Sequence, residues 1–198
     1  MQTIKSLLVE LDAVLKQYNT PEYKKLQPPL PDSDIDKFLQ EIGIHDENIK
    51  ALFQWKNGEK EDSYCQMMNY GGMQSLEIIK EWRMIDRPFD QFLIEIITDN
   101  GEESLLFNNK KGPYYGMIYI YSIGLLYIEH PISYFDSLTS MIKTTIEAYK
   151  TKAFKYDKED NWLDIDFKKY SVIAKKYNKK SAYWKKHDRL QWEEWYAI

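Results

Sequence analysis

The sequence has very little cysteine, since Cys65 is the only one among 198 residues. A single cysteine cannot form an intramolecular disulfide, and it has no second thiol for a zinc or redox pair. We therefore expect a reducing, cytoplasmic location. Long apolar runs are also missing, because the longest one, 117–121, is far too short to span a bilayer. Charges interrupt the first 20 residues as well, so we expect no export signal and no membrane anchor.

Recognisable catalytic motifs are missing too. The eight glycines form neither a P-loop nor a dinucleotide-binding pattern. His45, His130 and His187 lie in separate segments, so their spacing provides no pair of metal ligands on one helix face. No nucleophile elbow or oxyanion loop flanks Cys65. We expect no metal, no cofactor and no enzymatic activity.

The charge of the chain is unevenly distributed, although the net charge is only −4. Residues 1–149 contain 14 basic and 23 acidic side chains, whereas residues 150–198 contain 13 and 8. An acidic body accelerates association with a basic partner and disfavours nucleic acid. The alternative is an ordinary solvated surface with one lysine-rich helix. We expect a protein partner, with neither a nucleic acid nor a membrane involved.

Hydrophobic periodicity predicts several helices. Apolar residues recur at helical spacing in 4–18, 35–42, 49–55, 75–86 and 167–177, and also in 134–149 after a start at Ser133 or Asp136. Three prolines in 27–31 exclude a helix there and lead to an N-cap at Asp32 or Ser33. Gly43 is expected to end the second helix and Asp46 to cap the third.

Short strands are predicted in the middle of the chain. Apolar and β-branched residues occupy 92–98, 104–107, 117–121 and 125–128, with turn signals at 99–101 and 108–113. A loop is expected around Gly71 and Gly72, and an acidic turn at 156–162. These elements predict an α+β fold: an antiparallel sheet of about four to six strands, flanked by helices that cover one face, with a C-terminal helical extension. No repeat or linker requires a second domain.

Two charged clusters allow more than one interpretation. Carboxylates at Asp86, Asp90, Glu95, Asp99, Glu102 and Glu103 could serve acid–base chemistry, a docking rim or an inert surface. An enzyme that uses this group or Cys65 is the least favoured hypothesis. Lysines between 168 and 186 alternate with Tyr170, Tyr177, Tyr183 and Trp184. The helical spacing of these aromatics favours a packed helix with lysines in water over a nucleic-acid face.

Four segments together resemble the SUKH superfamily, the Smi and Knr type of domain. They are LPDSDIDKFL (30–39), ALFQWKNGE (51–59), MQSLEIIKEW (73–82) and TDNGEESLLFN (98–108). The residues that carry the match are Leu30, Pro31, Leu52, Phe53, Trp55, Asn57 and Gly58. Phe53 stands where the family typically has tyrosine. The resemblance covers about 28–150 of a single domain, 1–198, with an N-terminal helix in 1–27 and an extension in 151–198.

This resemblance implies a non-catalytic binding function. Bacterial members are mostly immunity proteins that neutralise toxins deployed between competing cells, often nucleases, so it implies a cognate and basic toxin domain as partner. The fungal relatives suggest the alternative, a regulatory scaffold that binds an endogenous protein. We expect the contact surface at the sheet and its hairpin rim, where tyrosine and charge suit an interface. The predicted contact residues are Asp99, Glu102, Glu103, Tyr114, Tyr115, Tyr119 and Tyr121.

The segment 51–60 itself is expected to be structural. Leu52 and Phe53 continue the helix face that begins at Ile49, and Asn57–Gly58 is expected to stop this helix in a left-handed conformation. Trp55 is expected to fasten that stop to the sheet.

Overall fold

The computed structural model describes residues 2–60, 66–68, 71–82, 92–98, 103–122, 131–160 and 162–186. Its helices are α1 (Ile4–Tyr18), α2 (Thr20–Lys25), α3 (Asp32–Glu41), α4 (Glu47–Trp55), α5 (Leu76–Trp82), α6 (Leu138–Lys150), α7 (Phe167–Tyr177) and α8 (Ala182–Lys186). Its strands are β1 (Gly72–Met73), β2 (Leu93–Thr98), β3 (Glu103–Asn108), β4 (Ile118–Ser122), β5 (Ile132–Phe135), β6 (Phe154–Asp157) and β7 (Trp162–Ile165). Among these helices, none has the length and apolar character needed to cross a membrane.

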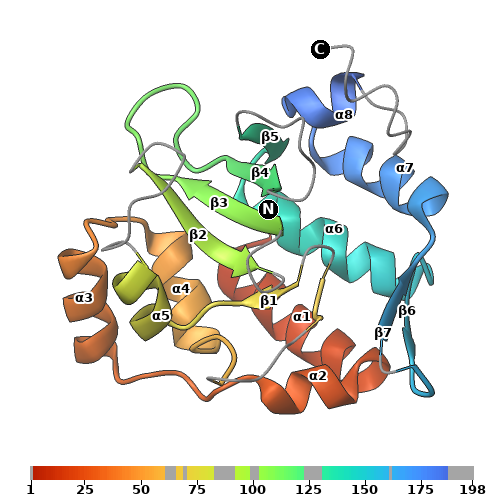
Figure 1. The fold of residues 1–198 in the computed structure, drawn as a ribbon, viewed down its shortest axis with the longest axis horizontal. Coiled ribbons are helices and arrows are strands. Elements are labelled where there is room, and N and C mark those ends of the chain that lie inside the picture. Colours follow the sequence, from red (N-terminus) through yellow and green to blue (C-terminus); the bar gives the residue numbers. More distant parts are fainter. Residues whose placement is uncertain are drawn as a thin grey trace.

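The fold is α+β, as the sequence predicted. Strands β1 to β5 form one antiparallel sheet in sequence order, and β6 pairs with β7 in a separate hairpin. Helices α3, α4 and α5 lie on the side of β1 and β2, whereas α7 and α8 lie on the side of β5 (Figure 1). Helices α1 and α6 pack against each other.

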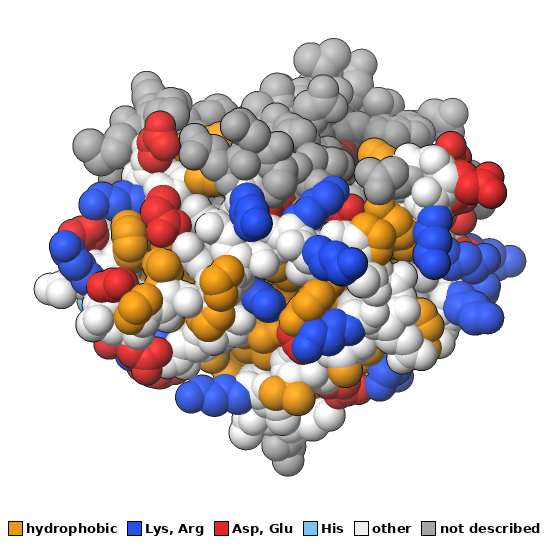
Figure 2. Space-filling model, turned by 90° about the horizontal axis from the view of Figure 1, so that it is seen from below, with side chains coloured by type: hydrophobic (Ala, Val, Ile, Leu, Met, Phe, Trp, Pro, Cys, Tyr) orange, Lys and Arg blue, Asp and Glu red, His pale blue; other side chains and the backbone are white. Residues whose placement is uncertain are grey.

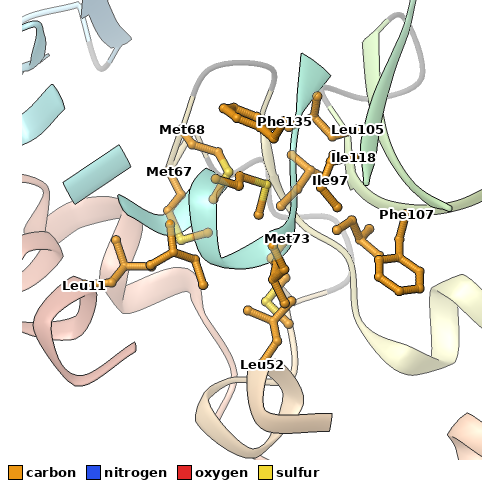
Figure 3. Packing of buried hydrophobic residues seen from close by; sticks show 14 of the residues in the cluster. Leu11, Leu52, Met67, Met68, Met73, Ile97, Leu105, Phe107, Ile118 and Phe135 are labelled. Carbon is orange, nitrogen blue, oxygen red and sulfur yellow. The ribbon is translucent and has the colours of Figure 1, made fainter. Parts of the chain in front are cut away.

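One face of the sheet carries the hydrophobic core. The strand register aligns Ile94, Phe107, Ile118 and Phe135 in one row across β2 to β5, and Ile97, Leu105, Ile120 and Ile132 in the next. All but the partly exposed Ile132 are buried. Met67, Met68 and Met73 fill the space between this face and the helices, near Leu11 and Leu52 (Figure 3). Methionine suits this position because its flexible thioether adapts to an irregular gap.

The opposite face of the sheet is also buried at β2 and β3. Glu95, Thr98, Ser104 and Leu106 lie there with 8% or less of their surface exposed. The prediction of a sheet covered on one face is therefore wrong at these two strands. The apolar run 93–98 lacks the strict alternation of a half-exposed strand, which is typical of strands buried on both faces.

Helix starts in the N-terminal half follow local capping chemistry. The Thr3 hydroxyl accepts from Ser6 N at the start of α1, and the Asp46 carboxylate accepts from Asn48 N and Ile49 N at the start of α4. Gly43, with φ +73°, follows α3 as predicted. Helix α3 begins at Asp32 after Pro31 without a side-chain cap, so the predicted N-cap at Asp32 or Ser33 is wrong by one residue or more.

Four short strands differ from the sequence-based prediction. Residues 132–135 form β5, so the following helix does not begin at Ser133 or Asp136. Ser137 caps α6 instead, with a reciprocal capping box to Ser140. Gly72 belongs to β1 rather than to a loop. The expected turn 156–162 contributes to the hairpin β6–β7, in which Phe154 and Leu163 face inward.

The lysine-rich C-terminal segment packs by its aromatic side. Tyr170, Tyr183 and Trp184 are buried, and the Trp184 indole donates to the Tyr134 carbonyl at 2.8 Å. The rings of Tyr134 and Trp184 lie 4.9 Å apart. This confirms the prediction that the aromatics of this segment form an inward helix face. The predicted strand 125–128 lies outside the described residues.

Candidate functional site

The segment 51–60 connects three parts of the chain. Helix α4 ends at Trp55, and its C-cap residue Lys56 is extended, with φ −152° and ψ 142°. The left-handed residue Gly58 comes two positions later, with φ +69°. A Cβ on Gly58 would lie 2.4 Å from the backbone of Gln74 and Ser75. The predicted left-handed helix stop is therefore wrong, because Gly58 permits close contact between two backbones instead.

The side chains around this glycine have structural partners. Buried Asn57 accepts from Leu76 N at 3.2 Å and donates to Glu77 Oε2 at 2.9 Å, at the N-terminus of α5. The Trp55 indole donates to Asp12 Oδ1 on α1 at 3.1 Å, so Trp55 is fastened to a helix rather than to the sheet. Leu52 and Phe53 are buried as predicted. These contacts show that the segment 51–60 has a structural role, because its side chains are occupied by contacts within the fold.

The predicted contact residues do not form one continuous rim. Asp99 and Glu102 lie outside the described residues. Glu103 begins β3 and pairs with Ser122, whereas Tyr114 and Tyr115 belong to the connection that follows the other end of β3. The six residues of β3 separate these two places by about 17 Å, at a rise of roughly 3.3 Å per residue. Tyr121 pairs with Ser104 near the Glu103 end, and Tyr119 lies between the two ends.

The connection 109–117, here named the tyrosine loop, contains the two most exposed of the predicted contact residues that the structure describes. Tyr114 is 61% exposed and Tyr115 is 37% exposed. Asn108 holds the loop from the end of β3, because its side chain donates to the Tyr114 carbonyl at 3.0 Å and accepts from Lys110 N at 2.9 Å. Its carbonyl also accepts from Gly116 N at 2.9 Å. The loop therefore presents its tyrosines in a preorganised conformation.

Tyr115 lies on the core side of the sheet, against the turn between α3 and α4. Its ring meets Phe107 edge-on at 5.9 Å, and its hydroxyl points to the His45 carbonyl at 3.5 Å. Burial and the adjacent carboxylate of Asp46 raise the pKa of Tyr115 to about 12. The phenol is therefore a neutral hydrogen-bond donor at physiological pH. Asn109 reinforces this contact by donating to the Gly43 carbonyl at 2.7 Å.

Tyr114 lies near the other side of the sheet, close to Tyr119. Burial raises the pKa of Tyr119, a hydrogen bond with Asn108 opposes this, and the neighbouring Tyr114 phenol raises it further. Tyr119 and Tyr121 are half-buried, on the same face as Leu106. The loop therefore lies at one end of the sheet, where Tyr115 contacts one face and Tyr114 neighbours Tyr119 of the other.

The surroundings of the tyrosine loop carry charges of both signs. Glu47 and His45 are exposed beside Asp46, and Lys110 and Lys111 are exposed on the loop itself. Lys110 also lies 5.3 Å from the ring centroid of Phe92, which is 41% exposed. Exposed aromatics within mixed charge are typical of protein-binding surfaces.

The structure describes only some of the candidate catalytic groups. Across the part of the chain that the structure describes, no group of three His, Cys, Asp or Glu side chains is placed to hold a metal ion. Glu95 is buried within the sheet and Glu103 is half-buried at the start of β3. The remaining candidates, Cys65, Asp86, Asp90, His130 and His187, lie outside the described residues.

Sequence reasoning missed the side chains that organise this surface. Asn108 and Asn109 looked like ordinary turn residues, yet each binds a backbone carbonyl beyond its own position. The Asn-Asn pair directly after an apolar strand was the available signal, because asparagine readily bonds to nearby backbone. The contact between the tyrosine loop and the α3–α4 turn could not be predicted from the sequence, because it joins residues that are far apart in the chain. No protein-family model matches this chain, and no curated protein matches it.

Proposed function

We propose that this protein is a non-catalytic binding module of the SUKH type, which acts as an immunity protein by occluding a cognate toxin domain. The tyrosine loop is the observation that carries this proposal. It combines two exposed tyrosines with a conformation fixed by Asn108 and Asn109. Such preorganisation lowers the entropic cost of binding, and tyrosine is enriched among the residues that dominate binding energy.

The charge distribution supports a basic partner. Helices α3, α4 and α5 carry exposed carboxylates on the side of the molecule where Tyr115 contacts the α3–α4 turn; they are Asp32, Asp34, Asp36, Glu41, Glu47, Glu77 and Glu81. Some of them pair with lysines, such as Asp36 with Lys50 at 2.5 Å. An acidic surface accelerates encounter with a basic protein and orients it before contact. The tyrosine loop and the α3–α4 turn together form the contact surface that we propose in place of the hairpin rim.

The partner can be identified by affinity purification from the native host, followed by expression of the bound protein in bacteria with and without this chain. An immunity protein restores growth and forms a stoichiometric complex with the toxic domain. The variant Tyr114→Ala/Tyr115→Ala should weaken that complex at least about 30-fold, the range of an interface hot spot. Trp162→Ala is the matched control, because Trp162 is an aromatic residue 54% exposed on β7.

The outcomes separate the two binding hypotheses. A bound partner that is harmless to cells contradicts the immunity function and favours a regulatory scaffold. Full affinity in the double tyrosine variant contradicts the placement of the interface on the tyrosine loop, whatever the partner is.

A further inference from the structure

The outer face of α7 differs in composition from the tyrosine loop. Residues 166–186 contain eight lysines and a single acidic residue, Asp166. Helix α7 places Tyr170, Ile173 and Ala174 in the core, so its lysines lie on the outward side. This helix lies at the end of the molecule opposite α3 (Figure 1). Figure 2, seen from below, shows lysine side chains gathered at the edge of the molecule where α7 and the β6–β7 hairpin lie.

An exposed valine occupies the centre of this face. Val172 is 68% exposed, and residues three and four positions away on a helix are its surface neighbours. In α7 all four of these positions are lysine: Lys168, Lys169, Lys175 and Lys176. Phe167, in the first turn of the same helix, lies about 140° from Val172 around the helix axis, on the side of the buried Tyr170 and Ala174. The face therefore combines dense positive charge with one accessible apolar side chain, Val172.

Two of these lysines form salt bridges with carboxylates among the described residues. Lys169 pairs with Asp166 at 3.1 Å, and Lys176 pairs with Glu147 at 2.7 Å. No salt bridge among the described residues involves Lys168, Lys179 or Lys185, which are all exposed. An anionic surface that approached α7 would therefore meet exposed lysines that form no salt bridge within the described residues.

The chemistry of the face favours a lipid surface over nucleic acid. Bases stack on exposed aromatic rings, but on α7 Tyr170 is buried and Tyr177 is half-buried with its hydroxyl bound to Glu147. The exposed Phe167 lies on the other side of the helix from the lysine face. Arginine, which recognises phosphate in a bidentate manner, is absent from α7 and α8. Lysine clusters with neighbouring apolar residues suit an anionic bilayer, where the ammonium groups contact headgroups and apolar side chains enter the interface.

We propose that the outer face of α7 binds the surface of an anionic phospholipid bilayer, through Lys168, Lys169, Lys175, Lys176 and Lys179 around Val172. The contact is peripheral and requires no membrane-spanning segment. It replaces the sequence-based expectation that no membrane takes part, and it does not depend on the proposed function. The tyrosine loop, at a separate part of the molecule, stays accessible to a partner in this arrangement.

The test is flotation of the full chain with vesicles of phosphatidylcholine, with and without 30% phosphatidylglycerol. Binding is expected only to the anionic vesicles, and 0.5 M salt should abolish it. Lys168→Glu/Lys179→Glu should weaken binding at least about 25-fold, because each lysine near an anionic surface contributes roughly fivefold. Val172→Ser keeps the charge and should weaken binding by roughly threefold or more, because an apolar contact is lost.

Lys5→Glu/Lys24→Glu is the matched control, because it makes the same change in net charge at exposed lysines of α1 and α2. Circular dichroism confirms that each variant is folded. Equal binding to neutral vesicles, or an equal loss in the control variant, overturns the proposal. Failure to float with anionic vesicles also overturns it, and binding to duplex DNA under the same conditions would then assign the face to nucleic acid.

Discussion

Gly58 and Gly43 show how the same backbone conformation can have different consequences at single residues. Both have φ near +70°, a region that favours glycine. A Cβ on Gly43 would meet no atom within 4 Å, whereas a Cβ on Gly58 would meet the Gln74 and Ser75 backbone at 2.4 Å. The first glycine is required by its torsion angle alone, and the second by its torsion angle and by its neighbours.

This difference predicts unequal costs for alanine. Gly43→Ala should lower the free energy of unfolding by about 1–2 kcal/mol, the cost of a left-handed residue with a Cβ. Gly58→Ala should cost at least about 2 kcal/mol more, because a backbone segment must also move. Urea unfolding followed by tryptophan fluorescence measures both. Equal losses in the two variants would contradict the close backbone contact at Gly58.

A second residue-scale prediction concerns Glu147 on α6. Burial raises the pKa of this carboxyl, but hydrogen bonds from Lys176 and Tyr177 outweigh it, so the net effect is a lowered pKa. Lys176 Nζ lies 2.7 Å and the Tyr177 hydroxyl 2.5 Å from Glu147 Oε2. A pKa lowered in the folded state gives stability that is complete above the unfolded pKa and is lost as pH falls through the folded value.

Glu147→Gln should therefore lower the free energy of unfolding by about 1 kcal/mol at pH 7. The difference from the unmodified protein should shrink as pH falls below 4.5, the ordinary pKa of the group. Urea unfolding between pH 3 and 7 measures this convergence. A difference that stays constant across that range contradicts the role of the ionised carboxylate.

Between elements, the main link is the junction between α4 and α5. Asn57 lies two residues after the end of α4, and its side chain bonds to the first turn of α5, where helix N–H groups lack internal partners. The backbone around it also joins β1, since Glu59 N donates to the Met73 carbonyl at 2.9 Å. Asn57 therefore satisfies a backbone N–H at the start of α5, where Ser75 Oγ accepts a second one from Ile78 N at 3.3 Å.

Asn57→Ala should lower the free energy of unfolding by about 2 kcal/mol, because a helix cap and a buried hydrogen bond are lost together. Glu77→Gln is the comparison, since its side-chain oxygen still accepts from Asn57 Nδ2 and it should cost less than about 0.5 kcal/mol. Thermal unfolding followed by circular dichroism compares the stabilities of the two variants. An Asn57 variant as stable as the Glu77 variant contradicts the capping role.

At the scale of the whole molecule, one hydrophobic cluster joins the N-terminal and C-terminal segments. It includes residues from Leu7 on α1 to Trp184 on α8. Within it, the aromatic rings form a chain of contacts. The ring centroids of Trp184 and Tyr170 lie 5.8 Å apart, those of Tyr170 and Phe154 5.0 Å, and those of Phe154 and Tyr149 5.4 Å. A cluster shared by distant segments makes their unfolding cooperative.

We therefore expect the full chain to unfold in one transition, with the same midpoint by fluorescence and by circular dichroism. Trp184→Ala should lower the free energy of unfolding by about 3–5 kcal/mol, because a large buried ring and a hydrogen bond to the Tyr134 carbonyl are lost. The exposed Trp162→Ala should have little effect. Two separate transitions in the unmodified protein would show that the C-terminal segment folds independently.

The sequence by itself determined the secondary structure that arises from local pattern. The apolar spacing of α1, α3, α4 and α7 and the apolar runs of β2, β3 and β4 were sufficient, because each pattern is complete within its own segment. Helix caps such as Asp46 were predictable for the same reason. The short strands β1 and β5 and the hairpin β6–β7 were not, because so few residues provide too short a period to distinguish from a turn or a helix.

Only the tertiary structure decided which predicted residues meet. It separated Glu103 from Tyr114 and Tyr115 by the length of β3, and it joined Tyr115 to a turn some seventy residues earlier. It also placed Asn57 and Gly58 against the start of α5 rather than at a helix stop. These arrangements depend on packing between distant segments, and the local spacing of apolar and polar residues contains no record of such contacts.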